Sequence, residues 1–236
     1  SGKQSIKERS ASDSMMNVYY KNHFGEVVDL KSGPYHLLAG DLLATGYWAA
    51  DIAGIEPGES VLIIGAGPAG LCTLQCVLLH RPGVVMVCEK DPQRRKFVEE
   101  HYPGVLTVAP EEAEEFVKAH TPHGGAGRVL EVAGTEDSFQ LAWKCARPNG
   151  VVTVVALYDA PQVLPLPEMY GKNLTFQTGG VDGCHVDDIL QLIAEGKLDT
   201  RPLITHTFPL REIEKAYEVF ENREDGVIKV AIQMEE

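Results

Sequence analysis

A glycine-rich loop between an apolar run and an apolar helix constrains the fold of this chain more than any other feature. Val61 to Ile64 are four apolar residues in a row, and Gly65-Ala-Gly-Pro-Ala-Gly70 follows them directly. Leu71 to His80 has the composition of a buried helix, and Val84 to Cys88 is a second apolar run of strand length. Uninterrupted apolar runs are typical of strands buried on both faces of a parallel sheet. The pattern therefore predicts a strand, a helix and a second parallel strand.

The same alternation continues along the chain. Asp91 and Pro92 have the residue types of a helix N-cap and first helical position, and that helix is expected to run toward Tyr102. Apolar spacing predicts further helices at 111–119 and 136–146, a turn at 148–150, and strands at 129–132, 151–157 and 174–178. This rhythm predicts an α/β fold, a Rossmann-type doubly wound parallel sheet with helices on both faces.

Three parts are expected in chain order. Residues 1–36 form an N-terminal arm, polar and without periodicity over residues 1–17. Residues 37–178 form the Rossmann domain, which opens with a helix from Leu37 to Gly54. Residues 179–236 form a C-terminal part with a helix at 187–194, an extended segment at 203–208 and a closing strand at 227–232; between them lies an amphipathic helix with Leu210, Ile213, Tyr217 and Phe220 on one face.

The acidic balance of the chain argues against two classes of partner. Its 21 Lys and Arg stand against 34 Asp and Glu, a formal net charge of −13, and no basic cluster offsets it. Such a charge repels phosphate backbones and anionic lipid surfaces. No run of about 18 apolar residues marks a membrane span, and the N-terminal residues lack the apolar segment of a secretory signal. We predict no nucleic-acid partner, no membrane association and a cytoplasmic location.

The cysteines favour the same compartment. Their number is odd, most lie inside apolar runs, and neither C-x-x-C pairs nor Cys/His zinc-finger spacing occurs among them. They are Cys72, Cys76, Cys88, Cys145 and Cys184. We expect buried free thiols in a reducing environment.

The glycine loop follows the pattern G-x-G-x-x-G, in which each glycine has a separate physical task. In a dinucleotide-binding unit Gly65 permits the tight turn, Gly67 lets the backbone approach a pyrophosphate, and Gly70 lets the helix pack close to the strand. Pro68 and Ala69 then open a helix whose N-terminus faces the phosphates. A purely structural turn is the alternative. The strand before the loop and the helix after it favour dinucleotide binding.

An acidic residue, Glu89, ends the second strand about twenty residues beyond the loop, where such proteins place a ribose-binding carboxylate. A carboxylate there accepts hydrogen bonds from both ribose hydroxyls and repels a 2′-phosphate, which predicts NAD rather than NADP. Lys90, Arg94 and Arg95 leave NADP open, because a guanidinium nearby is able to hold that phosphate. Their other interpretation is a solvated helix face. We expect Glu89, Lys90 and Arg94 to contact the cofactor.

Longer motifs carry a family resemblance. Asp41-Leu-Leu-Ala-Thr-Gly-Tyr47, Gly54-Ile-Glu-Pro-Gly58 and the glycine loop resemble the entry to the cofactor domain of the zinc-type alcohol dehydrogenases of the medium-chain family. Pro202-Leu-Ile-Thr-His-Thr-Phe208, the helix after it and Gly226-Val-Ile-Lys-Val230 resemble the C-terminus of that family. The resemblance spans residues 37–236. FAD bound at the same loop is an alternative that the surrounding motifs disfavour.

The resemblance implies roles for particular residues. Asp41 occupies the place of a catalytic-zinc ligand, and Thr45 that of a residue packing near the nicotinamide. Lys229 matches a basic residue that meets the pyrophosphate, and the stretch from Ala156 to Tyr158 borders the nicotinamide carboxamide. Val132, Ala156 and Leu157 are expected as cofactor contacts. Apart from the resemblance, Asp41 is interpreted as an acid stabilised by a helix N-terminus.

The chain also departs from the family. The Cys ligand, the Gly-His-Glu segment and the four-Cys loop of the family's N-terminal domain do not occur in it, and Asp41 supplies one of the three protein ligands that catalytic zinc normally has. His23, His36, His185 and His206 have no ligand spacing.

The resemblance implies a zinc-dependent, NAD-linked oxidoreductase acting on an alcohol or aldehyde, in a truncated form. A non-catalytic NAD-binding module is the alternative. The family's C-terminal part packs on its catalytic domain, and its dimer contact runs along the strand near Leu174. A homodimer or a higher homo-oligomer is therefore expected.

Overall fold

The computed structural model describes residues 18–21, 27–30, 34–180, 183 and 185–233. They form two compact units: the described residues up to Ala44 together with those from Gly183 onward, and the residues from Thr45 to the end of the 34–180 range. The expected Rossmann domain, 37–178, overlaps the second unit along most of its length. Residues 1–17, for which a loose arm was expected, lie outside the described residues.

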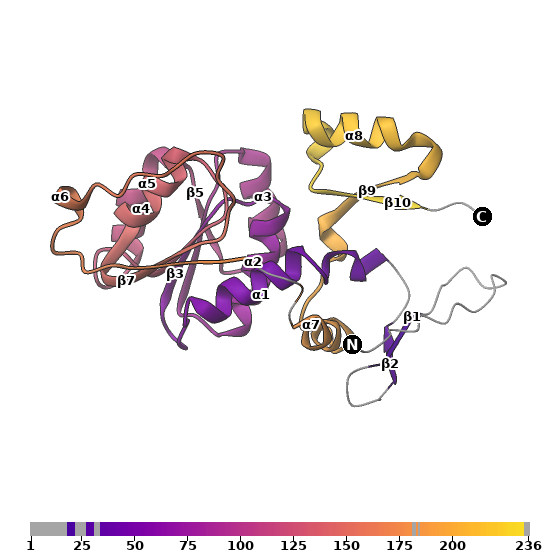
Figure 1. Ribbon diagram of the computed structural model, residues 1–236, viewed down its shortest axis with the longest axis horizontal. Helices are drawn as coiled ribbons and strands as arrows, with labels where there is room; N and C mark the ends of the chain where they lie inside the picture. The colour runs from indigo at the N-terminus through magenta and orange to yellow at the C-terminus, as the bar shows by residue number, and fades with distance from the viewer. Residues whose placement is uncertain (1–17, 22–26, 31–33, 181–182, 184, 234–236) are drawn as a thin grey trace. The chain divides into compact units, whose positions relative to one another are not determined.

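A six-stranded parallel sheet forms the centre of the second unit (Figure 1). Its strands are β3 (Ser60–Ile64), β4 (Val84–Cys88), β5 (Leu106–Val108), β6 (Ala126–Glu131), β7 (Ala146–Val154) and β8 (Thr175–Thr178). They lie in the order β5-β4-β3-β6-β7-β8, all in parallel pairs. This is the strand order of a doubly wound dinucleotide-binding fold, whose direction of winding reverses between β3 and β6. The predicted fold class is confirmed.

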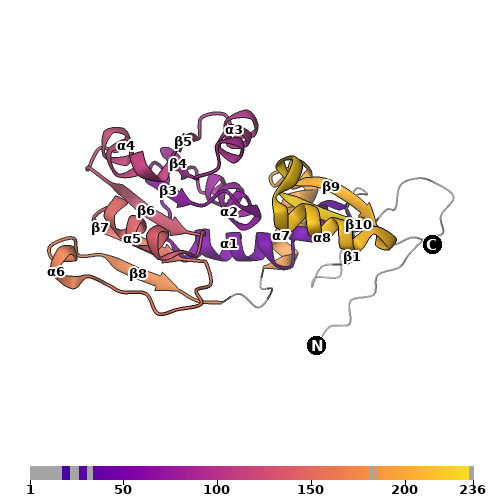
Figure 2. The same ribbon diagram turned by 90° about the horizontal axis from the view of Figure 1, so that it is seen from above.

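Helices cover both faces of this sheet. They are α1 (Leu42–Ile52), α2 (Pro68–Leu79), α3 (Pro92–His101), α4 (Ala113–His120), α5 (Glu136–Cys145) and the short α6 (Leu166–Met169). α4 and α5 lie on one side of the sheet, and α1, α2 and α3 on the other (Figure 1). Figure 2 shows β8 at the outer margin of the sheet, with α6 near the end at which β8 begins. The Asp91 side chain caps α3 by accepting from the Gln93 amide at 2.8 Å, as predicted.

The core explains why the apolar runs became strands. Val61, Leu62 and Ile63 on β3 are fully buried, and α2 is buried continuously from Gly70 to Val77. A strand between two others, covered by helices on both faces, has no side that tolerates polar residues. The four described cysteines are buried free thiols, as predicted, and Cys184 lies outside the described residues.

Several element boundaries differ from the predictions. The helix expected from Leu37 begins at Leu42, after a 3₁₀ helix η1 (Pro34–Leu38) and a turn that contains Gly40, because glycine is a poor helix former. The turn expected at 148–150 lies inside β7, where Asn149 has a φ of +58°. The strand expected to reach residue 157 ends at Val154. Strand β5 was not predicted, because three residues are too few for a periodic pattern.

The first unit contains two small sheets. β1 (Val18–Lys21) pairs antiparallel with β2 (Val27–Leu30), and β9 (Ile204–Pro209) pairs parallel with β10 (Lys229–Gln233). Its α-helices are α7 (Val186–Ala194) and α8 (Ile213–Asn222); short 3₁₀ turns η3 (Arg201–Leu203), η4 (Leu210–Glu212) and η5 (Glu224–Gly226) connect the elements. Leu210 precedes α8 in η4. No helix in the described part of the chain is long and apolar enough to cross a bilayer.

Candidate nucleotide-binding site

The loop between β3 and α2 requires glycine at two of its three motif positions. Gly65 has a φ of +106°, which other L-residues rarely adopt, and a Cβ there would stand 3.3 Å from Ala133. A Cβ on Gly70 would stand 2.0 Å from the carbonyl oxygen of Gly65. At Gly67, with a φ of −72°, the nearest heavy atom to a Cβ would be Arg94 Nη1 at 3.6 Å. The first and third glycines are therefore fixed by the backbone itself.

The beginning of α2 has the properties of an anion site. Gly67 is its N-cap and supplies no side-chain cap, Pro68 follows at the first helical position, and the first turn contains no acidic side chain. Helix N-termini expose unpaired amides and the positive end of the helix dipole. An anion placed there meets backbone donors without a competing carboxylate.

Glu89 is tied to the glycine loop at the carboxyl end of β4. Its side chain is 7% exposed, and Oε2 accepts a hydrogen bond from the Ala66 amide at 2.7 Å while Oε1 accepts from the Asp91 amide at 2.9 Å. The Gly65 amide also donates to the Cys88 carbonyl at 2.8 Å. The two features that the sequence placed about twenty residues apart are thus joined in one structure.

The three cations after Glu89 have different positions. Arg95 Nη1 donates to the backbone carbonyl oxygens of Glu89 at 2.5 Å and Lys90 at 3.0 Å, so this guanidinium is bound to the turn. Arg94 lies against the loop near Gly67, and Lys90 is exposed.

The expected nicotinamide-side residues lie at the same edge of the sheet. Val132 follows β6, and its amide donates to the Ile64 carbonyl at 2.9 Å. Ala156 and Leu157 follow β7; Leu157 is 95% exposed, and its carbonyl oxygen would be 2.9 Å from a Cβ on Gly134. The ends of β3, β6 and β7 therefore form one continuous rim.

Sequence reasoning missed Glu131, the last residue of β6. It is 0% exposed, and its carboxylate accepts hydrogen bonds from the amides of Ala133 at 2.8 Å and Gly134 at 2.9 Å and from the Tyr158 hydroxyl. The signal was present, because Glu131 ends an apolar run as Glu89 does.

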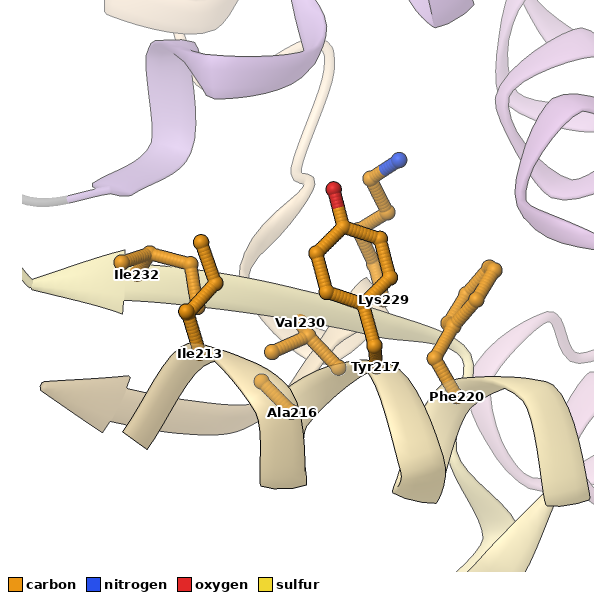
Figure 3. Close-up of a pocket in the computed structure, with 7 residues that line it drawn as sticks. All are labelled: Ile213, Ala216, Tyr217, Phe220, Lys229, Val230 and Ile232. Carbon is orange, nitrogen blue, oxygen red and sulfur yellow. The ribbon is translucent and has the colours of Figure 1, made fainter. Parts of the chain in front are cut away.

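Asp41, Thr45 and Lys229 are the remaining predicted residues. Asp41 is exposed in the turn before α1, and Thr45 is half-buried on that helix. Lys229, on β10, lines an apolar groove of about 240 Å³ formed by α8 and β10. Figure 3 shows the Tyr217 and Phe220 rings projecting from α8 beside this lysine, whose Nζ lies 5.9 Å from the Phe220 ring centre. Asp41 and Lys229 belong to the first unit, and the glycine loop to the second.

The described residues do not fit a catalytic zinc ion. Among them, no three His, Cys, Asp or Glu side chains are grouped so that they could hold a metal, and Asp41 is the one residue that the family resemblance offers. His23 lies outside the described residues. Catalytic zinc normally has three protein ligands and an open position. We therefore derive no chemical step through zinc for this chain.

Comparison with known proteins decides the family. A family model described as "Zinc-binding dehydrogenase" matches residues 68–195, from the start of α2 to the end of α7. The chain belongs to the zinc-binding dehydrogenases. The matched stretch contains Gly70, Glu89 and Glu131, and this family has an NAD(P)-binding domain.

Individual zinc-binding dehydrogenases resemble the chain in sequence and structure. A probable zinc-binding alcohol dehydrogenase of Mycobacterium tuberculosis is 32% identical over 184 residues, which cover 77% of this chain and 47% of that protein. The solved alcohol dehydrogenase TADH from Thermus sp. ATN1 is 30% identical, with a TM-score of 0.78 over 84% of this chain and 58% of its own. Zinc-dependent alcohol dehydrogenase 2 from Streptococcus pneumonia is 26% identical, with a TM-score of 0.80 over 93% of this chain and 62% of its own.

The matches cover more of this chain than of the relatives. The chain spans about half the length of the curated alcohol dehydrogenases that it matches. Most of these relatives are named as alcohol dehydrogenases, and one, from Rhizobium meliloti, is named as a putative D-xylulose reductase.

Proposed function

We propose that this chain binds a nicotinamide dinucleotide, with NAD preferred over NADP, as the cofactor part of a dehydrogenase that moves a hydride between a small alcohol or aldehyde and the cofactor. The hydrogen bond from the Ala66 amide to the buried Glu89 carboxylate carries this proposal. It joins the acid proposed to bind the ribose to the loop proposed to bind the phosphates, at the edge where doubly wound sheets bind nucleotides.

The pyrophosphate is assigned to the start of α2. Gly65, Gly67, Pro68, Ala69 and Gly70 would present backbone rather than side chains to it, and the helix dipole favours its charge. Lys229, on β10, is proposed as a further pyrophosphate contact on the family resemblance.

The preference for NAD rests on charge and on spare acceptor capacity. Two hydrogen bonds occupy the Glu89 carboxylate, and a carboxylate has about four lone-pair sites, so ribose hydroxyls are able to donate to it as well. A 2′-phosphate at the same place would meet that negative charge. Arg95 is bound to backbone carbonyls, which leaves Lys90 and Arg94 as the cations at the rim.

The nicotinamide is assigned to the rim formed by Val132, Ala156 and Leu157. Thr45 is proposed to orient the ring, and Asp41 is proposed as a catalytic residue and metal ligand of the whole protein, both on the family resemblance. The second candidate function, an NAD-binding module without catalysis, is favoured by one observation: the described residues contain no group able to hold a metal.

We further propose that the chain forms a homodimer along β8. This strand is the last of the sheet, and edge strands present unpaired backbone groups. The segment before it, residues 157–170, exposes five large apolar side chains: Leu157 (95%), Val163 (65%), Leu164 (42%), Leu166 (67%) and Tyr170 (92%). Exposed apolar surface of this kind marks an interaction site. A cytoplasmic location is supported by the four buried free thiols.

The experiment is a titration of the purified chain with NADH and NADPH, followed by nicotinamide fluorescence, with zinc measured on the same sample. Tighter binding of NADH than of NADPH supports the proposal, and binding without zinc favours the non-catalytic module. About one zinc per chain would instead favour a complete metal site. If neither nucleotide binds, the proposal fails.

A further inference from the structure

Glu131 is a buried acid that the nucleotide-binding proposal does not use. It ends β6, its side chain is 0% exposed, and the described part of the chain places no cation within ion-pairing distance of it. An ionised carboxylate in such a place needs hydrogen-bond donors. Three serve it: the Ala133 amide, the Gly134 amide and the Tyr158 hydroxyl.

The backbone of Glu131 makes a second set of contacts. Its carbonyl oxygen accepts from the Val155 amide at 2.8 Å and from the Ala156 amide at 3.2 Å. Together with the side-chain bonds, this one residue holds the turn after β6 and the segment after β7. These two segments contain Val132, Ala156 and Leu157, the residues assigned to the nicotinamide.

Tyr158, in the segment after β7, is held by contacts of both its ring and its hydroxyl. Its ring packs edge-on to Phe139, with ring centres 6.0 Å apart, so both the ring and the hydroxyl are fixed. Burial, and after it the hydrogen bond to Glu131, raises the pKa of the Tyr158 hydroxyl, which therefore remains a donor at neutral pH.

Gly134 brings the two segments into direct contact. A Cβ there would stand 2.9 Å from the Leu157 carbonyl oxygen and 3.2 Å from the Ala156 side chain. Nothing larger than glycine fits between the turn and the segment after β7. The rim is thus a packed, hydrogen-bonded surface.

We propose that Glu131 and Tyr158 are positioning residues for the nicotinamide half of the cofactor. This inference rests on the proposed function. The two residues would fix the backbone amides and carbonyls of the rim, to which the carboxamide of the nicotinamide would hydrogen-bond. A backbone fixed before binding spares the ligand the cost of ordering it. The side-chain hydrogen bonds of Glu131 go to the turn after β6 and to Tyr158, not to the loop that would hold the pyrophosphate, so the adenosine half should depend on them less than the nicotinamide half.

The test compares NADH with ADP-ribose, which lacks the nicotinamide, on the full chain. Tyr158→Phe removes the hydroxyl donor, and Glu131→Gln removes the charge at nearly constant volume. We expect each variant to bind NADH about ten-fold more weakly, because ordering a loosened rim then costs binding free energy, and ADP-ribose within about two-fold of wild type. The emission shift of bound NADH, which reports on the surroundings of the nicotinamide, should also diminish.

Tyr102→Phe is the matched control. Its hydroxyl accepts a hydrogen bond from Gln75 Nε2 at 2.9 Å at the end of α3, away from the rim, so it should leave the NADH emission shift unchanged. Thermal unfolding of each variant identifies loss of fold; if Glu131→Gln does not fold, Tyr158→Phe alone decides.

The outcomes separate the two proposals. Equal losses for NADH and ADP-ribose, or no loss for either, would overturn the positioning role while wild-type binding keeps the proposed function. A wild-type chain that binds neither ligand would overturn the proposed function itself.

Discussion

The α-carbon of Gly70 lies so close to Gly65 that a methyl group on it would stand 2.0 Å from the Gly65 carbonyl oxygen. The position of the Gly65 carbonyl therefore requires glycine at residue 70, whatever ligand the loop binds. Backbone meets backbone there, and neither partner is able to rotate away as a side chain would.

Gly70→Ala is expected to destabilise the chain by about 2 kcal/mol or more and to abolish NADH binding, because the start of α2 must move away from β3. Urea unfolding and fluorescence titration measure the two effects. Gly180→Ala is the control, since a Cβ on Gly180 meets nothing within 4 Å. Equal behaviour of the two variants would contradict the steric argument.

Glu89→Ala is expected to weaken NADH binding by about ten-fold and NADPH binding by less, so that the preference between them narrows. The amides of Ala66 and Asp91 also lose their acceptor, which predicts lower thermal stability. Parallel titrations with both nucleotides check this prediction. Glu100→Ala, at an exposed position on α3, is the control and should change neither nucleotide binding nor thermal stability. An unchanged ratio of NADH to NADPH affinity in Glu89→Ala would rule out a ribose contact.

Lys172→Met is expected to lower the free energy of unfolding by about 1–3 kcal/mol. Lys172 Nζ donates to the carbonyl oxygens of Trp143 at 2.9 Å, Lys144 at 2.7 Å and Ala146 at 3.0 Å, and so satisfies the end of α5. Methionine retains the length of the side chain but donates nothing. Urea unfolding measures this loss, and Lys96→Met is the control because the Lys96 side chain is exposed. Similar losses of unfolding free energy in both variants would refute the capping role of Lys172.

Alkaline pH should destabilise the chain through its buried thiols. Burial raises the pKa of Cys88 and of Cys145 from 9.0 to about 12. Since the folded pKa is above the unfolded one, the stabilisation is complete below pH 9 and is lost as pH rises toward 12. Unfolding free energies measured from pH 7 upward should therefore fall above pH 9. Cys145→Ala should show a shallower fall, and an identical slope would exclude this cause.

The sequence predicted the parts of the fold whose signal is local. An apolar run, a glycine motif and a capping Asp-Pro pair each act within a few residues, so β3, α2 and the start of α3 were expected where they occur. The acid Glu89 was found by its spacing from the glycine motif. Glu131 gave only the weaker signal of an acid that ends an apolar run, with no spacing rule to single it out.

What was not predicted depends on distant parts of the chain. Tyr158 meets Glu131 because β6 and β7 pair in parallel, with Glu131 beside Val154, and that register is not visible in either segment alone. The interpretation of Asp41 as a zinc ligand stays a prediction, because it depends on partner ligands and the described residues contain none grouped for a metal.

The exposed apolar segment before β8 should make the stability of the fold depend on protein concentration. If two copies of the chain associate through residues 157–170, only folded chains form the dimer, so dimer formation stabilises the folded state. The unfolding temperature of the chain should then rise with its own concentration. A dilute sample would lose structure at temperatures at which a concentrated one remains folded.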